Sequence, residues 1–330
     1  MTFPLTYLRL RFRCRAETPL FFGGLRTGSN LRGALVNVMR RATCADITPC
    51  PSPFGRGERD PVHAAHCPVC WLVAANDHPG QERRGYTITP PLGIAENLQP
   101  GEEFDFHITL FGEAARYLPY FVLAVPETGR SGVGPGRGRF SLKSIYAEHP
   151  LAGDWQVLKE GENVVRPPAG PVTHEAVEEA AKVLAARLSG QRPRLRIDFY
   201  TPLRLILDAH LLKSPDFGVF FARLLERLDE LSIQQAAGSP RPRQDRQRLW
   251  QLANQVRLVE SQTRWVDVPS GSSRAGQPTW ISGLVGTAIY NAPAETWRAL
   301  MPWLLWGQAA QVGKDTAKGN GVYRMNEERG

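Results

Sequence analysis

The chain has 330 residues, of which 42% are hydrophobic and 22% are charged. This composition excludes an intrinsically disordered protein, and the length is enough for two domains with full cores. Lysine and arginine outnumber aspartate and glutamate by 40 to 32, and the resulting charge of +8 is compatible with a polyphosphate partner without identifying one. No apolar run reaches the length of a membrane span and the N-terminal residues lack signal-peptide features, so we expect a cytoplasmic protein with no membrane partner.

The first half of the chain is predicted to alternate strands and helices in the order strand, helix, strand, strand, helix, strand. The expected elements are a strand at 5–22, a helix capped by Ser29 or Asn30, strands at 85–90 and 103–111, a helix at 114–125 and a strand at 140–147. This order is the ferredoxin-like βαββαβ pattern. A loop-rich insert that carries cysteines interrupts it at about 43–72.

The second half is predicted to repeat the pattern. A helix at 173–188 and a basic junction precede a strand at 195–207, a helix opened by Asp216, strands at 264–268 and 279–290, a Trp-rich helix at 294–310 and a strand at 322–325. A longer insert with a helical pattern is expected at about 236–260. We therefore predict an α+β fold of two tandem ferredoxin-like domains, residues 1–190 and 191–330.

Two glycine-rich runs occupy matching places, each between the second helix and the last strand of its half. The first is 129–139, with the cations Arg137 and Arg139, and the second is 313–321. Glycines permit close backbone approach, and exposed amides with cationic side chains suit phosphodiester oxygens. We expect RNA contacts there rather than plain flexible turns, and the residues proposed for them are Arg137, Arg139, Gly313, Gly319 and Gly321.

At these motifs the sequence resembles the CRISPR-associated precursor-RNA processing endoribonucleases of the RAMP superfamily. The family's C-terminal loop has the form G-h-G-x-x-x-x-x-G-h-G, where h is hydrophobic, and this chain follows it over 312–321 except that Gln311 replaces the first glycine and Asn320 a hydrophobic residue. Further stretches that carry the resemblance are 30–35, 106–112 leading to 138–140, and 200–205. The resemblance spans nearly the whole chain.

The resemblance implies two ferredoxin-like domains that bind CRISPR repeat RNA and cleave precursor crRNA without a metal ion. In that reaction the 2′-hydroxyl attacks the scissile phosphate, so a base, a proton donor and cations are needed. Many relatives place a histidine at or before the first helix, whereas residues 1–62 of this chain contain none. By analogy with relatives that use cation clusters, the candidates are Arg26, Arg32, Lys314 and Lys318, with Tyr323 ranked after them; a solvated helix face is the alternative for both arginines.

His107 is the histidine that the strand pattern singles out. Alternation over 104–110 places it, with Asp105 and Thr109, on the face opposite the core, where a sheet of this topology can bind RNA. We include His107 among the catalytic candidates, with an ordinary solvated strand histidine as the alternative. Arg241 and Arg243 lie in a Pro/Gln-rich segment that we interpret as a loop, which either grips a phosphate backbone or is simply solvated.

The cysteines form a compact pattern, Cys44-x5-Cys50-x16-Cys67-x2-Cys70. The Cys67-Pro-Val-Cys70 knuckle is typical of zinc sites because it turns both thiolates toward one ion. We predict a structural zinc ion bound by Cys44, Cys50, Cys67 and Cys70, with His63 and His66 as substitute ligands and free thiols as the alternative. Four protein ligands leave no open position for catalysis.

Three functions remain open at this point. The first is a metal-independent endoribonuclease that processes precursor crRNA for antiviral defense. The second is a catalytically silent relative that binds repeat RNA within a CRISPR effector complex, and the missing early histidine motivates it. The third is an adaptor that binds no RNA and docks through the cysteine-bearing insert. Salt-dependent RNA binding separates the third from the other two.

Overall fold

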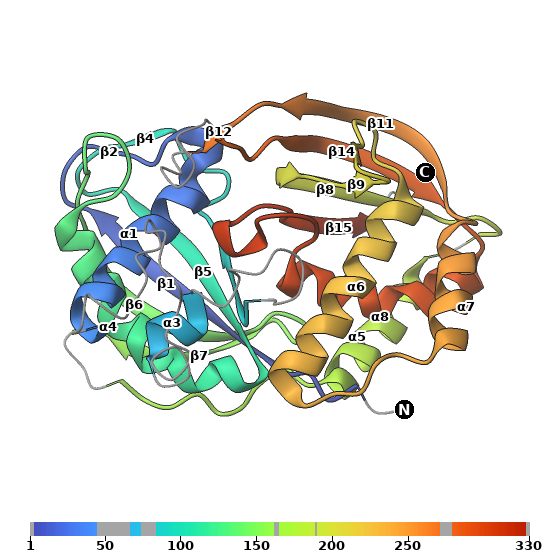
Figure 1. Ribbon diagram of the computed structural model, residues 1–330, viewed down its shortest axis with the longest axis horizontal. Helices are drawn as coiled ribbons and strands as arrows, with labels where there is room; N and C mark the ends of the chain where they lie inside the picture. The colour runs from blue at the N-terminus through green and yellow to red at the C-terminus, as the bar shows by residue number, and fades with distance from the viewer. Residues whose placement is uncertain are drawn as a thin grey trace.

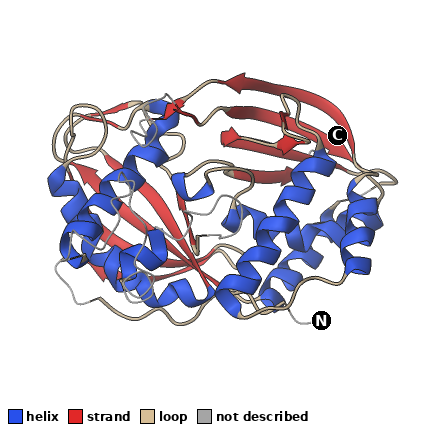
Figure 2. Ribbon diagram, viewed as in Figure 1, coloured by secondary structure: helices blue, strands red, loops and turns tan. Residues whose placement is uncertain are grey.

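Two antiparallel sheets, one in each half of the chain, organise the molecule (Figures 1 and 2). The computed structural model describes residues 3–44, 67–73, 84–161, 165–188, 190–270 and 279–327. Each sheet is covered on one face by two long helices, as the predicted α+β fold requires. No helix among these residues has both the length and the apolar composition that crossing a membrane would need.

The N-terminal sheet has the order β3-β5-β1-β6-β7. Its strands are β1 (Tyr7–Ala16), β3 (Tyr86–Thr89), β5 (Glu103–Phe111), β6 (Phe140–His149) and β7 (Asp154–Glu160). Without β7 this is the strand order of a ferredoxin-like domain, and the predicted positions of β3, β5 and β6 are confirmed. The strand predicted at 5–22 was wrong at its end, since β1 ends at Ala16 and Leu20 and Phe21 pair outside this sheet. The edge strand β7 was missed, because only one of its seven residues is buried and no apolar alternation marks it. A small pair, β2 (Leu20–Phe21) and β4 (Asn97–Leu98), lies beside the sheet.

Two helices bury their apolar sides against the N-terminal sheet. They are α1 (Thr27–Thr43) and α4 (Leu118–Ser131), which follows a 3-10 turn over Gly112–Tyr117. Leu31 and Leu35 of α1 share one core with Phe12 and Phe106 of the sheet, as the helical spacing predicted. The helix begins two or three residues before the predicted cap, because the turn Gly24–Arg26 runs directly into it. The short helix α3 (Pro68–Val73) packs on α1.

The C-terminal sheet has the order β11-β14-β8-β15, again that of a ferredoxin-like domain. Its strands are β8 (Arg194–Leu203), β11 (Arg257–Val266), β14 (Gly283–Asn291) and β15 (Tyr323–Glu327). Two short pairs, β9 (Ile206–Leu207) with β10 (His210–Leu211) and β12 (Pro269–Ser270) with β13 (Thr279–Trp280), flank it. The predicted strand at 264–268 was wrong at its start, since β11 pairs with β14 from Arg257 onward.

Four α-helices among the described residues contribute to the core under the C-terminal sheet. They are α5 (His174–Arg187), α6 (Phe217–Ala236), α7 (Arg243–Ala253) and α8 (Ala294–Ala310). Two of them have N-cap side chains: Thr173 accepts a hydrogen bond at the start of α5, and Asp216 does so at the start of α6. Trp297 and Trp306 of α8 are fully buried core residues. The proposed boundary between residues 190 and 191 stays a prediction.

The two halves are joined through the edge strand β3. Thr87 Oγ1 donates a hydrogen bond of 2.9 Å to the carbonyl oxygen of Ala309 at the end of α8. Gln311 Nε2, just beyond that helix, donates to the carbonyl oxygen of Ile88 at 2.8 Å. These buried bonds place the end of α8, and the glycine-rich segment that follows it, against the N-terminal domain.

Candidate nucleic-acid interface

The first element of the candidate interface is the start of α1. Gly23 and Gly24 both have positive φ values, of 98° and 58°, and lead into the 3-10 turn that ends at Arg26. Asn30 does not cap the helix; its amide donates a hydrogen bond of 2.7 Å to the carbonyl oxygen of Phe22. No acidic residue lies in the first turn of α1. Arg26 therefore stands at a helix start whose partial positive charge is not neutralised within that turn.

The second element is the glycine-rich loop, residues 311–322, which contains the 3-10 turn Thr316–Lys318. Gly313, Gly319 and Gly321 have φ values of 86°, 84° and 72°, where a larger side chain is strained. A Cβ on Gly321 would lie 1.8 Å from the carbonyl oxygen of Val312, so the loop closes tightly on itself. The side chain of Lys314 is exposed, whereas Lys318 Nζ forms an ion pair of 2.8 Å with Asp315.

These two elements are packed directly against each other. A Cβ on Gly28 in the first turn of α1 would lie 2.2 Å from the carbonyl oxygen of Lys318. Gly319 in turn approaches Gly28 and the end of β3. The fold thus brings the α1 start, with Arg26, to the loop that carries Lys314 and Lys318, although the two segments are almost 300 residues apart in sequence (Figure 1).

Arg32 lies about one turn beyond Gly28 on α1, and its side chain has a hydrogen-bond partner inside the N-terminal domain. Its Nε donates a hydrogen bond of 3.0 Å to the hydroxyl of Tyr86 in β3. The guanidinium is only partly exposed, so the simple solvated helix face does not describe it. Arg32 borders the same junction of α1, β3 and the loop, but it has a structural partner there.

The two departures from the family's loop pattern are both buried. Gln311 has φ of 59° and ψ of 166°, a conformation that glycine adopts far more easily. Its side chain is fully buried and donates to Ile88 and, at 3.3 Å, to Thr89. Asn320 is 2% exposed. Gln311 thus keeps the backbone shape of the missing glycine and adds a bond to the N-terminal domain.

The first glycine-rich run takes a different position from the second. Its beginning is helical, since α4 continues to Ser131, and the loop proper starts at Gly132. A Cβ on Gly134 would meet the carbonyl oxygen of Phe21 at 2.1 Å, so this loop packs on the segment just before α1. The side chains of Arg137 and Arg139 are exposed. Both glycine-rich loops therefore flank the start of α1, one from each domain.

His107 lies on the opposite face of the N-terminal sheet from Arg32. It pairs with Thr89, whereas Arg32 bonds to Tyr86, which points to the other side of β3. The structure therefore separates His107 from the cations near the glycine-rich loop. The prediction of an open sheet face was wrong at this point, since Thr109 is 1% exposed and the His107 side chain 15%.

His107 belongs instead to a groove of about 740 Å³ between the two halves. Its walls come from the N-terminal sheet, from α5 and α8, and from Arg324 of β15. Within it, His107 Nε2 donates to Glu148 at 3.1 Å, and the same carboxylate pairs with Arg9 at 3.2 Å and Arg11 at 3.3 Å. Sequence reasoning missed these residues; the alternating arginines of β1 were the available signal.

The surroundings in the groove lower the pKa values of both His107 and Glu148. Burial, followed by the positive charge of Arg9, lowers the pKa of His107 to about 4 despite its hydrogen bond to Glu148. Burial alone would raise the pKa of Glu148, but the hydrogen bond from His107 and the charges of Arg9 and Arg11 lower it to about 2. At neutral pH the histidine is therefore uncharged and the glutamate is ionised.

Arg241 and Arg243 do not share the loop that the sequence predicted. Arg243 is the first residue of helix α7 and is exposed. Arg241 is 9% exposed and forms an ion pair of 2.8 Å with the buried Asp229, while its guanidinium lies 3.9 Å from the centre of the Trp303 ring. The structure thus gives Arg241 an internal partner on α6 and leaves Arg243 on the surface.

Tyr323, the last of the cleavage candidates, is a core residue. It is 1% exposed, and its hydroxyl donates a hydrogen bond of 2.6 Å to the carbonyl oxygen of Leu304. Burial raises the pKa of this hydroxyl well above its ordinary value. Its position in the hydrophobic core favours a structural role for this hydroxyl.

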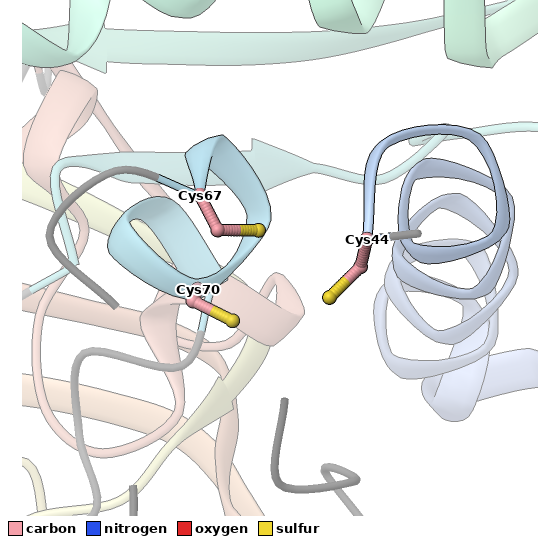
Figure 3. A group of neighbouring side chains, drawn as sticks. All are labelled: Cys44, Cys67 and Cys70. Carbon is pink, nitrogen blue, oxygen red and sulfur yellow. The ribbon is translucent and has the colours of Figure 1, made fainter. Parts of the chain in front are cut away.

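Three of the four predicted metal ligands come together. Cys44, Cys67 and Cys70 are buried, and their sulfur atoms all lie within 4.8 Å of one another, so they could hold a metal ion (Figure 3). Cys50, with His63 and His66, lies outside the described residues. Cys14 is buried alone in β1, where burial raises the pKa of its thiol.

Comparisons with known proteins agree with this architecture. Residues 5–170 match the family model AF_1859_N, described as an N-terminal domain, and residues 197–323 match the model of the CRISPR-associated endoribonuclease Cas6. A comparison with curated proteins gives no match.

Solved structures share the fold at low sequence identity. Cas6 in a product complex has a TM-score of 0.57 at 16% identity, over 97% of this chain and 99% of that one. Thermus thermophilus Cas6 has a TM-score of 0.57 at 14% identity, over 98% and 99% of the chains. A partial Cas6-RT-Cas1–Cas2 complex has a TM-score of 0.61 at 11% identity, over 98% of this chain and 46% of that one. The match to the Cas6 model over residues 197–323 assigns this chain to the Cas6 family of CRISPR-associated endoribonucleases, and the solved structures share its fold.

Proposed function

We propose that this protein binds CRISPR repeat RNA and cleaves precursor crRNA at one phosphodiester. The observation that carries the proposal is the contact between Gly28 and Lys318, which places a helix start and a cationic glycine-rich loop side by side within a Cas6 fold. Backbone amides and cations gathered in this way are suited to a phosphate group and to the charge that builds on it during cleavage.

The proposed reaction is a transesterification. The 2′-hydroxyl next to the scissile bond gives its proton to water and attacks phosphorus, the bond to the 5′-oxygen breaks, and that oxygen takes up a proton from water, leaving a 2′,3′-cyclic phosphate and a 5′-hydroxyl. Arg26, Lys314 and Lys318 are proposed to bind and orient the phosphate, so that attack occurs in line. The step requires no metal ion, and zinc at the cysteine cluster is proposed only as a structural ion.

Arg32 and His107 receive different parts in this proposal. Arg32 is proposed to support the phosphate site from its position on Tyr86. His107 lies in the interdomain groove with an ionised glutamate and two arginines, and there it is proposed to contact RNA that extends past the cleavage site. Arg137, Arg139, Arg243 and the three loop glycines are proposed as further RNA contacts.

A second candidate function is a catalytically silent binder of repeat RNA in a CRISPR effector complex. The observation that favours it is the lack of a histidine before residue 63, together with the location of His107 on the far face of the sheet. Both candidates predict RNA binding, and only the first predicts a cut.

The decisive experiment incubates the purified protein with its own host's repeat RNA in the presence of chelator. A matched RNA lacks the 2′-hydroxyl at the cut site. We expect cleavage of the first RNA, a 5′-hydroxyl product and no cleavage of the second. Tight binding without cleavage would favour the silent binder, and the absence of salt-dependent binding to either RNA would overturn both candidates.

A further inference from the structure

A cluster of three thiols joins the C-terminal end of α1 to α3. Cys44 follows the last residue of α1, while Cys67 directly precedes α3 and Cys70 lies in its first turn, separated from Cys44 in sequence by more than 20 residues. Figure 3 shows the three sulfur atoms pointing into the same space between the two helices. All three residues are at most 6% exposed.

We propose that Cys44, Cys67 and Cys70 form a thiolate site for a zinc ion that fastens the end of α1 to α3. Zinc–sulfur bonds are about 2.3 Å, so two sulfurs on one tetrahedral ion lie about 3.8 Å apart. The sulfurs here lie within 4.8 Å of one another, and small side-chain shifts bring all three onto one ion. This inference does not depend on the proposed RNA function.

The donor set favours zinc over the common hard cations. Magnesium and calcium prefer oxygen ligands, whereas thiolates select soft or borderline ions. Within the part of the chain that the structure describes, the cluster consists of cysteine sulfur alone. Three thiols also cannot all be satisfied by one disulfide, so an oxidised pair leaves a third thiol unused.

The proposed ion explains why so short a helix as α3 is held in place. A six-residue helix is not stable by itself. On one side α3 is anchored by Trp71, whose ring lies 4.8 Å from that of Tyr117 and 4.8 Å from the Arg116 guanidinium. The ion supplies the anchor on the other side, where α3 meets α1. Because α1 also carries Gly28 against the glycine-rich loop, the site fixes the far end of the helix that borders the candidate interface.

Metal content is the first test. The full chain is purified without a metal-affinity tag, and bound zinc is measured by atomic emission, with X-ray absorption at the zinc edge to count sulfur ligands. We expect about one ion per chain with at least three sulfurs near 2.3 Å. Cys44→Ser and Cys70→Ser should lose most of the zinc, and Cys14→Ala, which removes an isolated buried thiol, should keep it.

A second measurement on the wild-type chain covers the case in which the serine variants fail to fold. Iodoacetamide labelling followed by peptide mass spectrometry is compared before and after zinc is stripped with a chelator. Labelling of Cys44, Cys67 and Cys70 should rise severalfold on stripping, while that of Cys14 stays low. A disulfide between any two of the three, unchanged labelling after stripping, or a wild type that stays free of zinc after reduction and reloading would overturn the proposal.

Discussion

Gly28 and Lys318 meet at a distance that leaves no room for a side chain, since a Cβ at position 28 would lie 2.2 Å from the Lys318 carbonyl oxygen. Backbone atoms on both sides make the contact, so relief requires movement of either α1 or the glycine-rich loop. Adding one methyl group at position 28 therefore tests whether the packing of α1 on the glycine-rich loop contributes to stability and to RNA binding.

We expect Gly28→Ala to lower the free energy of unfolding by about 1–3 kcal/mol, because the added methyl group clashes with backbone. If the proposed function holds, RNA affinity falls with it. Gly33→Ala is the matched control, since a Cβ at position 33 would meet nothing within 4 Å and alanine gains about 0.5–1 kcal/mol of helix propensity over glycine. Urea denaturation and RNA titration measure both effects. Equal behaviour of the two variants would show that the contact carries no energy.

The charge of Lys318 is tested by Lys318→Gln. We expect weaker RNA binding and a slope of log affinity against log salt that is shallower by about 0.7, the value for one lost phosphate contact on a single strand. Lys182→Gln on α5 is the control, because Lys182 also forms an i,i+3 ion pair, at 2.9 Å with Glu179, but away from the glycine-rich loop. An unchanged salt slope for Lys318→Gln would remove this lysine from the phosphate site.

The sequence predicted the fold well where burial imposes a clear period. The apolar positions of α1, α6 and α8 and the alternation in β1, β5 and β6 identified those elements, because one face of each is buried. The start of β11 was missed because Arg257–Glu260 is exposed along its length, so no apolar alternation marks it. A sheet edge needs only a backbone partner, which the sequence does not display.

The candidate site was predictable only in part. The glycines of the loop that packs on α1 marked it in the sequence, because few other residues adopt the positive φ values that the loop contains. The roles of His107 and Arg241 could not be predicted, because each depends on a partner distant in sequence. His107 bonds to Glu148 in β6, and Arg241 forms an ion pair with Asp229 in α6. Tertiary structure alone determines which charges are paired and which remain available to a ligand.

The His107–Glu148 pair predicts a loss of stability in acid. The pKa of His107 is about 4 in the folded protein against an ordinary value of 6.5, so the unfolded chain binds the proton more readily between these values. The contribution of His107 to the free energy of unfolding is therefore fully present above pH 6.5 and is lost as the pH falls toward 4. Glu148 has a pKa of about 2 in the folded protein against an ordinary value of 4.5. Its contribution to the free energy of unfolding is therefore lost as the pH falls from 4.5 to 2.

His107→Gln should flatten the stability curve between pH 6.5 and 4, where wild type loses up to about 3 kcal/mol from this group. His210→Gln, in the exposed strand β10, is the control and should follow the wild-type curve. Urea midpoints at intervals of pH give the comparison. A His107→Gln curve parallel to wild type would show that the histidine titrates at its ordinary pKa.

Gln311 combines a strained backbone with an interdomain hydrogen bond, and two substitutions separate these contributions. Gln311→Ala keeps the strain and loses the bonds to Ile88 and Thr89, whereas Gln311→Gly loses the bonds but relieves the strain. The glycine variant should therefore be more stable than the alanine variant by about 1–3 kcal/mol. Thermal unfolding of both variants beside wild type provides the measurement, and equal stability of the two would mean that the backbone at 311 is unstrained.

Substitutions of Arg241 and Arg243 should differ in their effect on stability, although the sequence places both residues in one segment that either grips a phosphate backbone or is solvated. Arg241→Ala removes the close partner of the buried Asp229 and leaves, among the described residues, the more exposed Arg246 at 3.1 Å, so we expect a loss of about 2–3 kcal/mol. Arg243→Ala should leave stability within about 0.5 kcal/mol of wild type, since Arg243 is exposed. Asp229→Asn in the Arg241→Ala background should recover part of the loss, because no buried charge then lacks its partner. Urea denaturation of the three variants tests this, and an Arg241→Ala protein as stable as wild type would place Arg241 among the surface cations open to RNA.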